Sequence, residues 1–152
     1  MGSERSAFWD DLVNDLEDPE LLREYVAESI RVATIDRIVN ELDRARAAAG
    51  LTKAGLAHAI GSEPATVRRL FSASHVNPTL GTLAEVAAAL GMRVVLEPMG
   101  ASDLEQITRP LVEGSTDDPR ALAMRVDELR NGASSPLSAT PSTRNGPGHL
   151  RH

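Results

Sequence analysis

Two short helices joined by a tight turn are predicted by Leu51-Thr-Lys-Ala-Gly-Leu-Ala-His-Ala-Ile-Gly61 and the adjoining Ser62-Glu-Pro-Ala-Thr-Val-Arg-Arg-Leu70. Thr52 is expected to cap the first helix, and Gly61 to end it, because glycine adopts the left-handed conformation of a turn at little cost. Pro64 suits the first position of the second helix, since its φ angle is already helical. Each helix is expected to bury one face, because apolar residues recur at helical spacing. The buried positions would be Leu56, Ala57, Ile60, Val67, Leu70 and Phe71.

The rest of the 152-residue chain also indicates helices, because aromatic residues make up only 3% of it and Ala and Leu are abundant. Asp18-Pro19 is expected to divide the acidic N-terminal segment into two short helices. Further helices are expected over residues 30–49, 80–90, 102–111 and 117–129. The predicted fold class is therefore all-α.

One strand is expected over Met92-Arg-Val-Val-Leu-Glu-Pro98, where apolar and charged residues alternate. A lone strand needs a partner for its backbone groups, and no second strand is visible in the sequence. The expected partner is the same strand of a second copy about a two-fold axis. The predicted dimerisation residues are Val94, Val95 and Leu96.

These patterns divide the chain into five parts. They are an acidic helical extension (residues 1–30), a helical domain (31–91), a dimerisation strand (92–98), appended helices (99–130) and a tail (131–152). The tail is rich in Ser, Pro, Gly and Thr, so it is expected to be disordered.

The two central helices, together with Asn77-Pro-Thr-Leu-Gly-Thr-Leu-Ala-Glu-Val-Ala-Ala-Ala-Leu-Gly91, resemble the Cro/C1-type (xenobiotic-response-element, XRE) helix-turn-helix family. The resemblance runs from about Ile35 to Gly91 and implies a five-helix DNA-binding domain. Within that family, the Asn77-Pro-Thr-Leu phrase and the strand are most similar to HigA-type antitoxins of toxin–antitoxin pairs. Gly55 departs from the pattern, because relatives usually carry a helix-forming polar residue there.

The resemblance implies that the second helix enters the major groove of double-stranded DNA. Arg68 or Arg69 would then bond a guanine, and Glu63 would accept from a cytosine amine. Thr52 and Lys53 begin the preceding helix, where family members contact phosphate. The implied DNA-binding residues are Thr52, Lys53, Glu63, Ala65, Thr66, Arg68 and Arg69. The alternative is that the two arginines form a solvated face or pair with acids.

Charge is unevenly distributed along the chain, whose formal net charge is −6. Residues 1–30 hold nine acids and two bases, a balance of −7, whereas residues 31–72 hold seven bases and four acids, a balance of +3. Screening limits phosphate attraction to about 10 Å, so an acidic front end is compatible with a basic DNA-binding segment.

The acidic front end also predicts a docking surface for a basic partner such as the RelE/HigB-like ribonuclease toxins that HigA-type proteins restrain. The predicted contact residues are Trp9, Leu12, Leu16 and Tyr25. The alternative is that these helices pack on the core and carry solvating charge.

Other chemistry is not expected. The absence of cysteine excludes disulfides and thiol chemistry and fits a cytoplasmic protein, and no apolar run is long enough to span a membrane. His58 and His75 are expected to be solvated or to touch phosphate, and His149 and His152 are too isolated to hold a metal. No constellation of Ser, His and acid stands out, so we expect neither an enzyme nor a cofactor.

The resulting hypothesis is a homodimeric antitoxin that represses its own operon and neutralises a RelE/HigB-like ribonuclease toxin. A stand-alone regulator of the XRE family without a toxin is the first alternative. A protein-binding adaptor whose helix-turn-helix no longer binds DNA is the second.

Overall fold

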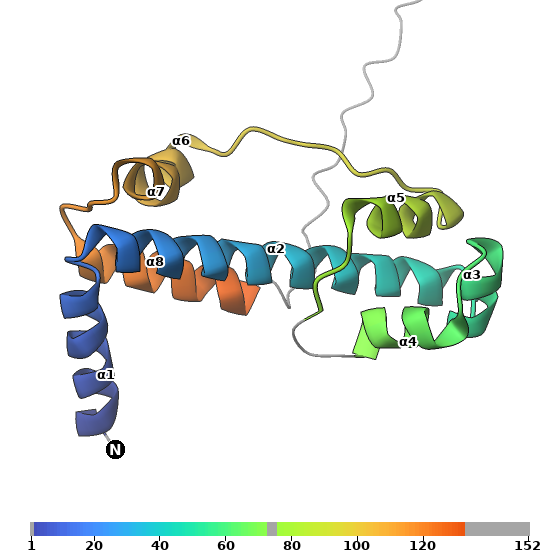
Figure 1. Cartoon of the computed structure of the whole chain (residues 1–152), viewed down its shortest axis with the longest axis horizontal. Helices are drawn as coiled ribbons and strands as arrows, with labels where there is room; N and C mark the ends of the chain where they lie inside the picture. The colour runs from blue at the N-terminus through green and yellow to red at the C-terminus, as the bar shows by residue number, and fades with distance from the viewer. Residues whose placement is uncertain (1, 73–75, 133–152) are drawn as a thin grey trace, which may run out of the picture.

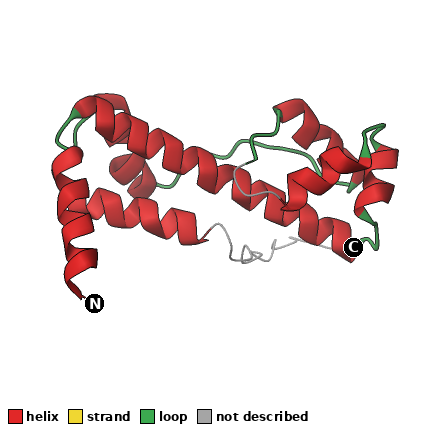
Figure 2. Cartoon of the chain, turned by 60° about the horizontal axis from the view of Figure 1, so that its bottom comes forward, coloured by secondary structure: helices red, strands yellow, loops and turns green. Residues whose placement is uncertain are grey.

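The fold is taken from a computed structural model that describes residues 2–72 and 76–132. The described residues form helices and connecting loops (Figure 2). The elements are α1 (Gly2–Asp15), α2 (Pro19–Ala48), α3 (Lys53–Ala59), α4 (Pro64–Ser72), α5 (Leu80–Ala89), α6 (Ala101–Asp103), the π-helical turn η1 (Leu104–Thr108), α7 (Arg109–Glu113) and α8 (Pro119–Gly132).

Helix α2 extends along most of the molecule and contributes to both of its ends (Figure 1). The Asp18 carboxylate accepts hydrogen bonds from the backbone N–H groups of Glu20 and Leu21 at 2.8 and 3.3 Å, so the predicted break at Asp18-Pro19 is confirmed. The prediction of two separate helices, one before and one after Ile30, is wrong. They form one continuous helix of 30 residues, because neither proline nor glycine follows Pro19 until Gly50.

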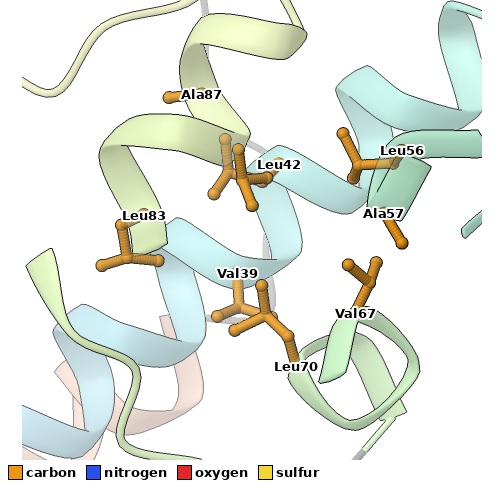
Figure 3. Packing of buried hydrophobic residues seen from close by; sticks show 9 residues of the cluster. Val39, Leu42, Leu56, Ala57, Val67, Leu70, Leu83 and Ala87 are labelled. Atoms are coloured by element: carbon orange, nitrogen blue, oxygen red, sulfur yellow. The ribbon is translucent and has the colours of Figure 1, made fainter. Parts of the chain in front are cut away.

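The first of two cores lies between the second half of α2 and helices α3, α4 and α5 (Figure 3). Leu56 and Val86 are completely buried in this core, and each such side chain contributes roughly 1.5–3 kcal/mol of stability. Four described helices surround the first core, rather than the five that the resemblance implied. The first core consists of Val39, Leu42, Leu56, Ala57, Val67, Leu70, Leu83, Val86 and Ala87.

The second core joins the N-terminal helices to the helices that follow residue 100. The first half of α2 packs against α8 and α7, and α1 packs against α8 (Figure 1). The expected N-terminal extension and the expected appended helices therefore form one bundle. The second core consists of Leu16, Leu22, Val26, Ile107, Leu122, Ala123 and Val126.

The prediction of a strand over residues 92–98 is wrong. These residues are extended loop in the structure, and Figure 2 draws a loop where the strand was expected. The backbone N–H of Met92 bonds the Ala87 carbonyl oxygen at 2.8 Å and so closes α5. The following residues meet no second strand in the described part of the chain. Alternation of apolar and charged residues is typical of strands, but a strand forms only where another strand is available for pairing.

The helices expected over residues 102–111 and 117–129 are present, the first with a π-helical turn in its middle. The N–H of Arg109 bonds the carbonyl oxygen of Leu104, five residues earlier, which is the pattern of a π-helical turn. Pro110 follows this turn and has no N–H to donate. The tail predicted to be disordered lies, from residue 133 on, outside the described residues.

No helix in the described part of the chain is both long enough and apolar enough to cross a membrane.

Candidate nucleic-acid interface

Helices α3 and α4 pack against each other through buried apolar side chains, as the sequence predicts. Leu56 and Ala57 of α3 and Val67 and Leu70 of α4 are all buried in the first core (Figure 3). The Thr52 hydroxyl accepts a hydrogen bond from the backbone N–H of Gly55 at 2.9 Å, so the predicted cap of α3 is confirmed. This packing fixes the orientation of α4 relative to α3.

The turn between the two helices depends on Gly61, whose φ angle is +64°. Its backbone N–H bonds the His58 carbonyl oxygen at 3.2 Å, and the N–H of Ser62 bonds the Ala57 carbonyl oxygen at 2.9 Å. A residue with a Cβ atom is strained in this left-handed region. Pro64 then begins α4, as predicted. The local sequence therefore specifies both the end of one helix and the start of the next.

The outer face of α4 carries the residues predicted to contact bases. Val67 and Leu70 point inward, which leaves the opposite face of this nine-residue helix to solvent. Arg69 forms no ion pair or hydrogen bond with any described residue, and Arg68 donates only to the carbonyl oxygen of Pro64, at 3.4 Å. Two cationic side chains are thus available on an exposed helix. The exposed residues are Glu63, Ala65, Thr66, Arg68 and Arg69.

The predicted phosphate-contacting residues lie at the start of α3. Lys53 is the first residue of this helix and is partly exposed, and Thr52 is exposed immediately before it. His58 is exposed on α3, whereas His75, His149 and His152 lie outside the described residues. No group of three potential metal ligands occurs among the residues that the structure describes.

Arg46 of α2 holds α3 and α4 in place, a role that the sequence analysis missed. Its Nη1 donates to the carbonyl oxygen of Leu51 at 2.7 Å, and its Nε donates to Asp43 Oδ1 at 2.8 Å. Its guanidinium carbon lies 5.9 Å from the centre of the Phe71 ring, within the range of a cation–π interaction. An arginine in the last turn of a helix often bonds nearby carbonyl groups, so that part was predictable. The contact with Phe71 depends on the tertiary fold.

The acidic helix α1 and the pair of helices α3 and α4 lie far apart in space. Helix α1 lies at one end of the molecule, and α3 and α4 lie at the other (Figure 1). The 30-residue α2 that separates them is about 45 Å long at 1.5 Å per residue, several times the screening length of about 10 Å in 0.1 M salt. The negative charge of α1 therefore has little effect on the electrostatic potential at α4.

The residues predicted to bind a toxin take part in the second core to different extents. Leu16 is buried, with 2% of its surface exposed, so it faces the bundle rather than a partner. Trp9, Leu12 and Tyr25 pack against the same core and are partly exposed. Leu12 and Tyr25 also line a surface hollow of about 270 Å³ between α1, α2 and α8, which we call the acidic hollow. Its other lining residues are Asp15, Leu16, Leu21, Glu24, Glu28, Ser29 and Arg130.

Comparison with known families identifies a helix-turn-helix in this chain. Residues 42–95, about a third of the chain, match the helix-turn-helix family model, and this range includes α3, α4 and α5. The match supports a DNA-binding transcriptional regulator of the Cro/C1 (XRE) type. No curated protein and no solved structure matches the chain.

Proposed function

We propose that this protein is a sequence-specific regulator that binds the operator of its own operon as a homodimer and does so without catalytic activity. The observation that carries the proposal is the exposed outer face of α4, where Arg68 and Arg69 are available for contact. An arginine can form two hydrogen bonds with a guanine in the major groove. A dimer on an inverted repeat would place two such helices about one turn of DNA apart.

Base contacts and phosphate contacts can be separated by two variants in a mobility-shift assay with the DNA upstream of the gene. Arg69→Ala should cost roughly 1–3 kcal/mol of operator affinity and relax sequence preference. Lys53→Ala should weaken binding to all sequences alike and reduce the salt slope by about one. Arg31→Ala is the matched control, because it also removes a positive charge but lies on α2 and pairs with Glu28. If Arg69→Ala keeps full affinity and selectivity, the assigned face of α4 is wrong.

A second proposed activity is neutralisation of a basic ribonuclease toxin, and the acidic hollow supports it. Asp15, Glu24 and Glu28 line the hollow together with Leu21 and Tyr25, and Leu21 is 44% exposed. A basic segment with an apolar side chain would complement this surface in both charge and polarity. Leu21, rather than the buried Leu16, is the expected contact residue on this surface.

Co-expression with a small basic protein encoded next to the gene tests this activity. The double variant Asp15→Lys with Glu24→Lys should abolish rescue of growth from that toxin. The control, Asp11→Lys with Glu17→Lys, makes the same change of charge at exposed positions outside the hollow and should keep rescue. Rescue by both double variants, or a neighbour that is not toxic, would favour the stand-alone regulator.

A further inference from the structure

The segment that follows α5 presents apolar side chains to solvent. Leu96 is 99% exposed, Val95 62%, Met99 45% and Val94 39%. Isolated exposed apolar residues are common on protein surfaces, but four within six consecutive positions form a patch of the kind that marks an interaction site. We therefore expect a partner to cover this patch.

A hollow of about 350 Å³ lies beside this segment, between α2 and α5. We call it the apolar hollow. Ile38, Leu42 and Ala87 contribute apolar surface from the two helices, and Met92, Val94 and Val95 contribute it from the segment itself. Leu96 is next in sequence but does not line the hollow.

The charges around the apolar hollow are mixed. Glu41, Arg93 and Glu97 line it, and none of the three forms an ion pair with a described residue. Two acids and one base do not suit a phosphate backbone, which excludes DNA as the occupant. One chain thus presents both signs of charge on the same surface as its apolar patch, which is the requirement for a surface that complements itself.

We infer that this surface joins two copies of the chain about a two-fold axis, with Leu96 of each copy entering the apolar hollow of the other. Arg93 of each copy then faces Glu97 of the other, so each pair of charges forms twice. The inference deepens the homodimer of the proposed function and rests on it. It does not require pairing of strands, because side chains make the contact. None of the residues that line the apolar hollow belongs to α4, so both α4 helices stay available for DNA.

Sedimentation of the full chain at micromolar concentration tests the apolar part of the interface. The unaltered chain should be a dimer, and Leu96→Asp should raise the dissociation constant at least tenfold. Val112→Asp is the matched control, because Val112 is an exposed valine of α7 (69% exposed) outside the hollow, and it should leave the dimer unchanged. A monomeric unaltered chain, or a dimer equally stable with aspartate at position 96, would overturn the inference.

A charge exchange tests the arrangement of the two copies. Arg93→Glu and Glu97→Arg should each weaken their own dimer at least tenfold, because like charges then face each other. An equimolar mixture of the two should form a heterodimer of near wild-type affinity, measured by native mass spectrometry. A mixture no tighter than either variant alone would show that Arg93 does not face Glu97 and would overturn the proposed arrangement. Circular dichroism controls for folding.

These results are independent of the test of operator binding. If Leu96→Asp leaves the dimer unchanged and Arg69→Ala loses operator binding, the proposed interface is wrong and the DNA-binding function is retained. If the chain forms a dimer that depends on Leu96 but binds no upstream DNA, the proposed interface is retained and the DNA-binding function is wrong.

Discussion

The guanidinium group of Arg23 and the carbonyl group of Leu111 are joined by a hydrogen bond of 3.3 Å, although the two residues lie 88 positions apart. Arg23 also donates to the Val112 carbonyl oxygen at 3.1 Å. A positive charge near the C-terminal end of α7 interacts favourably with the helix dipole and with carbonyl groups that have no partner inside the helix. The start of α2 and the end of α7 are thereby held together.

Gly114 lies against this contact, so substitution there is predicted to disturb it. Its φ angle is +73°, and an added Cβ atom would lie 2.8 Å from Arg23 Cζ. Gly91→Ala is the control, because Gly91 has a φ angle of +72° with open space around it. The control should cost about 1 kcal/mol of unfolding free energy. Gly114→Ala should cost more, and the excess should shrink in an Arg23→Ala background. Equal losses in the two glycine variants would contradict the contact.

The two cores are predicted to respond differently to loss of a buried leucine. Leu22 in the second core and Leu56 in the first are both completely buried, so each change to alanine should cost about 2–5 kcal/mol. Only Leu56→Ala should reduce operator affinity, because only the first core supports α3 and α4. Thermal unfolding and mobility shift measure the two effects. A similar loss of affinity in Leu22→Ala, at a temperature where that variant is folded, would show that the two cores are coupled.

The parts of the fold that sequence predicts well are specified by neighbouring residues. Thr52, Gly61 and Pro64 set the ends of α3 and α4 through their own backbone preferences and caps. The spacing of Val67 and Leu70 identifies the buried face of α4, and with it the exposed face that carries the candidate site.

The parts that sequence did not predict depend on residues far apart in the chain. Leu22 and Leu122 share the second core, but nothing near either residue indicates the other. The same limitation explains the strand predicted over residues 92–98, because an alternating pattern does not show whether a second strand is available. The helical spacing of Leu16 indicates an apolar face, but it does not show whether that face meets another protein or α8.

Arg46 is predicted to affect DNA binding without touching DNA. Arg46→Ala removes its bond to the Leu51 carbonyl oxygen and its contact with Phe71, and should cost roughly 1–3 kcal/mol of stability. Operator affinity should fall as well, because α4 loses a support. Arg46→Lys should restore part of the stability but not the planar contact with Phe71. Chemical denaturation and mobility shift measure both effects, and Arg31→Ala, at an exposed ion pair, should change stability by at most about 1 kcal/mol. Unchanged operator affinity in a less stable Arg46→Ala would limit this residue to a structural role.

We predict that the stability of the protein falls at alkaline pH because the Tyr25 hydroxyl loses its proton. Burial raises the pKa of its hydroxyl above 10.0, and nearby Asp127 adds to the rise while Arg130 opposes it. A raised pKa in the folded state means that the folded chain holds the proton more tightly than the unfolded chain. The contribution to stability is therefore fully present below pH 10 and is lost as the pH rises through the folded pKa. Tyr25→Phe should flatten this decline in melting temperature. The chain has one tyrosine, so its ultraviolet absorbance titration reports on this hydroxyl alone. A midpoint at or below 10 in the folded protein would contradict the prediction.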